Sequence, residues 1–386
     1  MFFILLVFVM FANFMVNALI DPIDLIKSHS YPAERHFAVT DDGYIITIHR
    51  ISRGKHLNKT GPPVLLGHGT GSSSADFLNA GPERGLGYIL ADSGFDVWIG
   101  NSRGNSYSTN HIKYNSEREA KAFYNFSFHD IGYYDYPAQI DYVLNVTGKS
   151  KLYFIGHSQG GTAYYVMGST RTDYNNKIRL AVLLGAPAIM KNTPQKLFRI
   201  FADVIFDVED LANLMGLYHI PFLESQRMFA YKFCSLPKNH KLCQDFMYLF
   251  LGFEDNEQNN MGKTFKFFLS TPSDFSLKTL LHFGQIIKSE TFRQYDYRPE
   301  GNLRQYGAIE PPIYNLSLII SPLALFCGKN DASLNLKDVE IMEKLLPNVV
   351  YKYIVPWNKF NHGDFVLATD VVNLLYNDLI RILKMY

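Results

Sequence analysis

The feature that most constrains the fold of this 386-residue chain is a series of short, uniformly apolar runs separated by segments with helical spacing. These runs lack the alternation of apolar and polar residues that marks a strand with one solvent-exposed face, so each is expected to be buried on both faces. Helices on both sides of a parallel sheet produce this pattern. We therefore predict an α/β fold with a mostly parallel sheet. The expected strands are residues 64–66, 95–100, 151–157, 179–187, 323–328 and 349–355.

Two regions depart from this alternation of apolar strands and helical segments. Near the N-terminus, alternating segments flank Asp41-Asp42-Gly43, a pattern typical of an antiparallel hairpin. Residues 188–310 are mostly helical in pattern, and a single apolar stripe runs from Leu197 to Met215. The stripe suits either packing within the insertion or contact with lipid. The domain prediction is one α/β domain, residues 19–386, with a helical insertion at about 188–310.

Charge and composition exclude some partners. The chain has 37 basic and 36 acidic residues and a net charge of +1, so no nucleic-acid partner is expected. The hydrophobic fraction of 47% is enough for a sizeable core. No stable protein partner is inferred.

The first 18 residues favour export. An apolar run ends at Val16-Asn17-Ala18, which predicts a signal peptide cleaved after Ala18, with an uncleaved anchor as the alternative. In an oxidising compartment, Cys234 and Cys243 are the natural disulfide pair, and Cys327 is expected to be a buried free thiol. Glycosylation sequons begin at Asn58, Asn125, Asn145 and Asn315.

The candidate nucleophile is Ser158, within Gly156-x-Ser158-x-Gly160. An expected strand precedes this motif and a helical stretch follows it. Such a strand-to-helix turn exposes the serine hydroxyl, and the flanking glycines remove side chains that would collide there.

A serine hydroxyl needs a base, and the base needs an orienting acid. Asp331 follows the expected strand 323–328, and His362 follows the strand 349–355. Because both loops leave the carboxyl ends of parallel strands, Asp331 and His362 are expected at the same edge of the sheet as Ser158.

Other residues are less well placed for these roles. His157 is expected to point away from the nucleophile, His68 to be structural, Asp338 to lie beyond the loop, and Asp364 to start the last helix, residues 365–383. Backbone N–H groups of Gln159 and Thr70 are the candidate oxyanion donors, since one follows the nucleophile and the other lies in the loop after the strand 64–66.

These residues resemble the acid lipase family, which includes gastric and lysosomal acid lipases. The similar stretches span most of the chain: DVWIGNSRGNSYS at 96–108, GHSQGG at 156–161, FRQYDY at 292–297, GKND at 328–331 and FNHGDF at 360–365. The resemblance implies an α/β-hydrolase fold with an inserted helical cap or lid and the Ser158, Asp331 and His362 triad. It also implies the Thr70 and Gln159 oxyanion donors, a Cys234–Cys243 cap disulfide, and no metal or organic cofactor.

One departure concerns the oxyanion loop. The family usually has His-Gly-Leu-Leu where this chain has His68-Gly69-Thr70-Gly71. Backbone donors survive the change, but the wall above the acyl site is altered.

The predicted function is a secreted or lysosomal lipase that hydrolyses neutral lipid esters, triacylglycerol or steryl ester, at a lipid–water interface. The alternatives are a short-chain carboxylesterase and a non-catalytic lipid-binding protein on the same scaffold.

Overall fold

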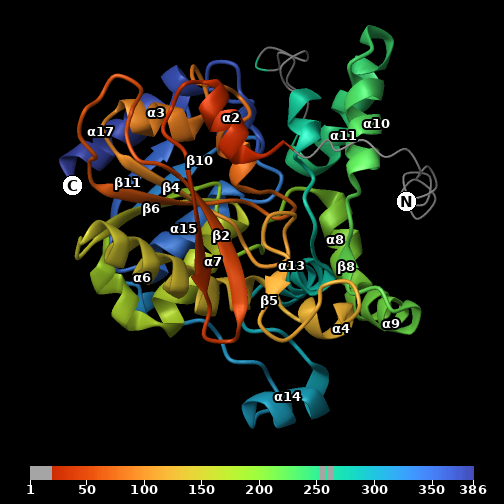
Figure 1. Ribbon diagram of the computed structural model, residues 1–386. Helices are drawn as coiled ribbons and strands as arrows, with labels where there is room; N and C mark the ends of the chain where they lie inside the picture. Colours follow the sequence, from red (N-terminus) through yellow and green to blue (C-terminus); the bar gives the residue numbers. More distant parts are fainter. Residues whose placement is uncertain (1–19, 253–257, 259–264) are drawn as a thin grey trace.

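A computed structural model of the protein describes residues 20–252, 258 and 265–386 (Figure 1). The expected signal segment, residues 1–18, lies outside the described residues. The main sheet has the order β1-β2-β4-β3-β6-β7-β10-β11, with β5 paired to β2. The strands from β4 to β11 along this order are parallel, whereas β1, β2 and β5 pair antiparallel. The prediction of a mostly parallel sheet is confirmed.

The strands lie close to their predicted positions. Their bounds are β1 Glu34–Val39, β2 Tyr44–Ile51, β3 Pro63–Gly67, β4 Asp96–Gly100, β5 Asn110–His111, β6 Leu152–His157, β7 Ile178–Leu184, β10 Leu323–Cys327 and β11 Val349–Ile354. The expected hairpin is β1–β2, and Gly43 in its turn has φ +100°, a conformation that favours glycine.

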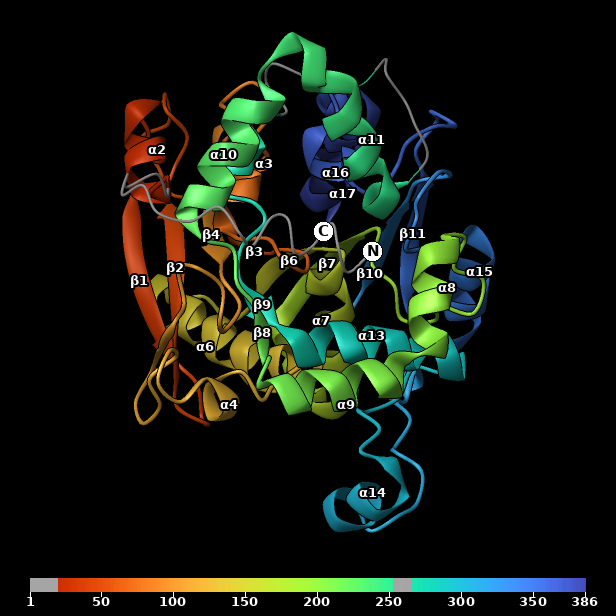
Figure 2. The ribbon, with the colours of Figure 1, turned by 90° about the vertical axis from the view of Figure 1, so that its right-hand side faces the viewer.

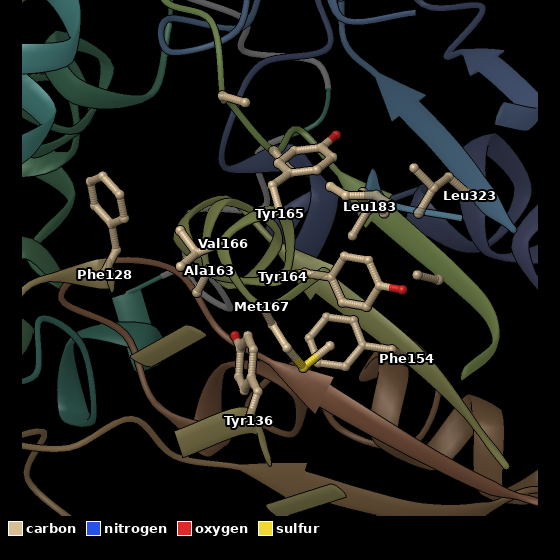
Figure 3. Packing of buried hydrophobic residues seen from close by; sticks show 14 of the residues in the cluster. Phe128, Tyr136, Phe154, Ala163, Tyr164, Tyr165, Val166, Met167, Leu183 and Leu323 are labelled. Carbon is tan, nitrogen blue, oxygen red and sulfur yellow. The ribbon is translucent and has the colours of Figure 1, made fainter. Parts of the chain in front are cut away.

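Two apolar layers enclose the sheet, because alternate residues of each strand face opposite sides. On β6, Phe154 packs with α6 (Tyr136–Thr147) and α7 (Gln159–Thr170). Its neighbour Ile155 packs on the other face with α3 (Leu86–Asp92) and α17 (Asn377–Met385). Figure 3 shows side chains of α7 gathered around Phe154.

The remaining short elements complete these layers. They are α2 Pro22–Ser28, η1 Ser74–Phe77, α4 Ala120–Phe123, α5 Phe128–Asp130, η2 Ile131–Asp135, η3 Thr172–Lys177, η6 Leu316–Leu318, α15 Leu336–Leu345, α16 Asp364–Leu367 and η7 Val372–Tyr376.

The insertion between β7 and β10 is largely helical, as expected, and lies beside the sheet (Figures 1 and 2). Its described elements are α8 Lys196–Asp203, α9 Ile205–Met215, β8 His219–Ile220, α10 Glu224–Cys234, η4 Pro237–Asn239, α11 His240–Leu251, η5 Phe265–Leu269, β9 Phe275–Ser276, α13 Leu277–Ser289 and α14 Arg298–Tyr306. Strands β8 and β9 form a small antiparallel sheet that the sequence pattern did not predict.

The apolar stripe from Leu197 to Met215 is not one continuous helix. The chain leaves helical geometry at Val204, between α8 and α9. The change of direction lets Ile205 pack against Gly284 of α13, where a Cβ on Gly284 would lie 2.4 Å from Cδ1 of Ile205. The stripe therefore divides into a buried part around Ile205 and an exposed part that includes Leu214 and Met215.

The C-terminal segment also differs from the single helix expected over 365–383. Helix α16 ends at Leu367, and Ala368 is extended. The backbone N–H groups of Thr369 and Asp370 donate to Gln258 of the insertion. These long-range hydrogen bonds replace the helical ones at this point.

The three cysteines have the predicted states. Cys234 and Cys243 form a disulfide, and Cys327 is a buried free thiol. Burial raises the pKa of Cys327 to about 12, so the thiol stays protonated. Within the parts of the chain that the structure describes, no helix combines the length and the apolar character needed to cross a membrane.

Candidate active site

Ser158 lies at the sharp turn between β6 and α7. Its backbone has φ 54° and ψ −124°, a strained conformation for a residue that carries a side chain. The Ser158 N–H donates to Leu184 O, and the Ser158 carbonyl accepts from Gly161 N–H, so both sides of the turn are held. The strain therefore persists and presents the hydroxyl at the carboxyl edge of the sheet.

The glycines around Ser158 are required by close backbone approach. A Cβ on Gly156 would lie 2.7 Å from Gly161 N, and one on Gly160 would lie 2.3 Å from Gly67 O. Either side chain would push α7 away from β6 or from the loop after β3. The motif thus has the packing reason that its sequence context predicted.

The structure brings Ser158, His362 and Asp331 together in one line. The Ser158 hydroxyl oxygen Oγ lies 2.7 Å from Nε2 of His362. The other ring nitrogen, Nδ1, lies 2.9 Å from each carboxylate oxygen of Asp331. Because that carboxylate accepts a hydrogen bond, Nδ1 carries the proton and Nε2 is free to accept one from Ser158.

Asp331 and His362, the candidate acid and base, are largely buried, and hydrogen bonds within its own loop hold Asp331. Asp331 is 3% exposed, and its Oδ1 accepts the N–H groups of Ser333 and Leu334. These bonds and the His362 ring direct the carboxylate toward one position. His362 is 7% exposed, which limits the water around its ring.

The two other histidines considered have supporting contacts. His157 Nε2 donates to the backbone carbonyl of His362 at 3.1 Å, so His157 supports the loop of the base and does not face the Ser158 hydroxyl. Nε2 of His68 accepts Ser102 N–H at 3.0 Å. Burial lowers the pKa of His157 to about 3 and that of His68 to about 4, so both rings are neutral near pH 7.

The two other carboxylates are structural. Asp338 accepts hydrogen bonds from the backbone and side chain of Asn192. Asp364 begins α16, as expected, and accepts Asn361 N–H at 2.8 Å, which closes the turn that carries His362.

Two backbone N–H groups beside Ser158 are candidate donors to an oxyanion. Among residues 20–252, 258 and 265–386, neither Thr70 N–H nor Gln159 N–H donates to a protein atom. A Cβ on Gly69, which precedes Thr70, would lie 3.2 Å from Ser158 Cβ, so this loop lies against the nucleophile. Backbone N–H groups that donate to no protein atom and lie next to a nucleophile can stabilise a developing oxyanion.

Sequence reasoning missed the residues of the insertion that contact the site. The His362 N–H donates to Leu251 O at 2.8 Å, and Gly252 forms a β-bridge with Asp331. Ser273 N–H donates to Gly71 O of the oxyanion loop at 2.7 Å. No local pattern marks these backbone contacts, because each joins segments far apart in the sequence.

The chain is similar in sequence to known hydrolases. The family described as alpha/beta hydrolase fold matches residues 62–364, and a partial alpha/beta-hydrolase lipase region matches residues 23–81. Lipase 1 of Drosophila melanogaster is 39% identical over 93% of this chain and 78% of that protein. Gastric triacylglycerol lipase of Bos taurus is 33% identical over 93% of this chain and 90% of that protein.

A solved structure agrees on the fold. A soluble variant of monoglyceride lipase from Saccharomyces cerevisiae matches with a TM-score of 0.52 at 17% identity, covering 92% of this chain and 98% of that one. The Ser-His-Asp arrangement at the edge of the sheet and the sequence relationship to gastric lipase together lead to one assignment. This chain belongs to the acid lipase family of α/β hydrolases.

Proposed function

We propose that this chain is a lipase that hydrolyses carboxylic esters of neutral lipids, triacylglycerol or steryl ester, through an acyl-enzyme on Ser158. The observation that carries the proposal is the continuous line of hydrogen bonds from Ser158 Oγ through His362 to Asp331. Membership of the acid lipase family supports the lipid ester as the substrate class.

The geometry supports a two-step acyl transfer. His362 Nε2 takes the proton of the Ser158 hydroxyl as Oγ attacks the ester carbonyl, and it returns that proton to the departing alcohol. Asp331 holds the ring and stabilises the imidazolium. Water activated by His362 then attacks the acyl-enzyme, which releases the fatty acid and restores Ser158.

The oxyanion of each tetrahedral intermediate is assigned to Thr70 N–H and Gln159 N–H. Gln159 N–H is the first donor of α7, so the positive end of the helix dipole adds to its hydrogen bond. Both donors are in place before substrate binds, which removes the cost of reorienting them during the reaction.

The insertion, residues 188–310, is assigned the contact with lipid. Its helices expose large apolar side chains, including Leu214 at 84%, Met215 at 64% and Leu242 at 63%. Large apolar side chains left in solvent are typical of an interaction surface. We infer that this surface meets the lipid–water interface and that the insertion forms a cap over the site.

The protein is assigned to the extracellular fluid, with the lysosomal lumen as the alternative. Residues 1–18 have the pattern of a signal peptide. The Cys234–Cys243 disulfide suits an oxidising compartment. Asn58, Asn125, Asn145 and Asn315 are all exposed, as glycosylation requires.

The test is hydrolysis of emulsified triacylglycerol and steryl ester by the full-length protein, with Ser158→Ala as the matched control. We expect turnover by the wild type and a loss of at least about 10³-fold in the variant. Hydrolysis of a soluble short-chain ester alone would favour the carboxylesterase. Equal rates for wild type and Ser158→Ala would overturn the assignment of the nucleophile.

A further inference from the structure

Thr70 lies in a loop whose backbone has few intrinsic restraints. Gly69 and Gly71 flank it, and glycine loses more conformational freedom on folding than any other residue. Gly71 has φ +65°, which a side chain would disfavour. Hydrogen bonds must therefore hold the Thr70 N–H in position.

The loop is anchored on both sides of Thr70. Before it, Nε2 of His68 accepts hydrogen bonds from Ser102 N–H and the Asn105 side chain. After it, Gly71 O accepts from Ser273 N–H of the insertion. The carbonyl of the Gly69–Thr70 peptide also accepts hydrogen bonds from His68 Nδ1 at 2.8 Å and from Ser72 N–H at 3.3 Å, so the loop itself restrains this peptide.

The side chain of Thr70 adds a restraint of another kind, because it links this loop to α7. Its hydroxyl donates to Oε1 of Gln159 at 2.7 Å. Gln159 is 4% exposed and begins α7, whereas Thr70 is half-buried. The hydrogen bond therefore joins the two residues whose backbone N–H groups have no protein acceptor in the described parts of the chain.

We propose that Thr70 is a positioning residue: its hydroxyl, through Gln159, sets the spacing and direction of the two oxyanion donors. This inference rests on the proposed function, because the donors act only in a reaction at Ser158. Without the bond, the oxyanion loop and the start of α7 are no longer linked beside Ser158, and part of the preorganisation of the two donors is lost.

Four variants of the full-length protein test this role. Thr70→Val removes the hydroxyl and keeps the shape, whereas Thr70→Ser keeps the hydroxyl. Gln159→Met removes the acceptor and keeps the backbone N–H. The double variant Thr70→Val/Gln159→Met completes a double-mutant cycle. Thr170→Val is the matched control, because Thr170 lies at the far end of α7 and its hydroxyl bonds Val166 O.

Two rates are measured for each protein. The first is kcat and KM for a soluble p-nitrophenyl ester. The second is the rate of labelling by a fluorophosphonate. In that reaction Ser158 Oγ forms a bond to phosphorus, fluoride leaves, and the proton of the Ser158 hydroxyl passes to His362. The phosphoryl oxygen occupies the oxyanion site, so this rate reports on the donors without any lipid substrate.

We expect Thr70→Val and Gln159→Met each to lower kcat and the labelling rate about tenfold, less than the loss of a whole oxyanion donor. KM should stay within about twofold, because the bond acts in the transition state. Thr70→Ser should recover most of the rate. The double variant should be no slower than the slower single variant, because both remove one interaction.

Other results would overturn the proposal. Equal rates for Thr70→Val and Thr170→Val would remove the role of the hydroxyl. Slow Thr70→Val with normal Gln159→Met would mean that the hydroxyl binds the oxyanion directly. A wild type that is labelled but hydrolyses no lipid ester would refute the proposed substrate and leave this inference standing. A wild type with neither activity would refute both.

Discussion

Strands β3, β4, β6 and β10 of the sheet bury every residue, whereas α8, α9, α10 and α11 of the insertion leave many large apolar side chains in solvent. In the sheet, apolar burial on both faces stabilises a rigid frame, and that frame holds the strained turn at Ser158. In the insertion, the same residue types remain available to a partner. The difference is the basis of the proposal that the sheet holds the catalytic geometry and that the insertion contacts lipid.

The two regions are not independent. Leu251 and Gly252, at the end of α11, contact the backbone of His362 and Asp331, and Ser273 contacts the oxyanion loop. The insertion therefore contacts the loops of the proposed triad as well as the proposed oxyanion loop.

The largest expected loss of kcat comes from a substitution at the edge of the sheet, at the proposed catalytic acid. Asp331→Asn leaves the fold intact but favours the wrong tautomer of His362, so we expect kcat to fall about 10⁴-fold. The kcat for a soluble ester is the measurement, and thermal unfolding shows whether the variant is folded. Near-normal turnover by a folded Asp331→Asn would mean that another group orients His362.

The next effect tests the contact between the two regions. A Cβ on Gly252 would lie 2.2 Å from Asn330 O and 2.9 Å from Asn361 Cβ, beside the acid and the base. We expect Gly252→Ala to lower kcat about 10²-fold, because small misplacements of catalytic groups are costly.

The control for that substitution is Gly216→Ala, which also has positive φ and lies in the insertion but has open space around its Cα. It should cost about 1 kcal/mol of stability and little activity. If both variants lost activity equally, the contact with the catalytic loops would not be the cause.

A smaller effect should separate the surface from the chemistry. Leu214→Ser/Met215→Ser removes two exposed apolar side chains of α9, and we expect the rate on emulsified lipid to fall about tenfold through weaker adsorption. The kcat/KM for a soluble ester should not change. Ile112→Ser, at a side chain 72% exposed outside the insertion, is the matched control. Equal losses on both substrates would place Leu214 and Met215 in a structural role.

The smallest expected effect is on the pH dependence of stability, through a hydrogen bond between the α/β domain and the insertion. Asp76 is buried beside the oxyanion loop, accepts the Thr271 hydroxyl of the insertion at 2.5 Å, and has a pKa that burial raises to about 7. A pKa raised above the unfolded value of 3.8 means that the folded state holds the proton more tightly. Its contribution to stability is present below pH 4 and is lost as the pH rises through 7.

Asp76→Asn stays neutral at every pH. We expect its Tm, relative to the wild type, to rise by roughly 2–4 °C between pH 5 and pH 8. Thermal unfolding at the two pH values is the measurement. A constant difference in Tm would show that Asp76 does not titrate in this range.

Local patterns in the sequence were sufficient to predict most strands of the main sheet and the candidate triad. The apolar runs determined where β3, β6, β7 and β10 lie, because burial on both faces leaves few polar positions in a strand. The G-x-S-x-G turn and the loops after two strands singled out Ser158, Asp331 and His362, since parallel strands end at one edge of the sheet.

Only the tertiary structure decided how the insertion meets this frame. The break at Val204, the bonds from Thr369 and Asp370 to Gln258, the contact of Leu251 with His362 and the Thr70–Gln159 hydrogen bond all join distant segments. A periodic pattern reports which face of an element is apolar, but not which surface that face will meet. Sequence therefore determined the strands and the candidate triad, while long-range packing decided how the site is supported and where the insertion remains exposed.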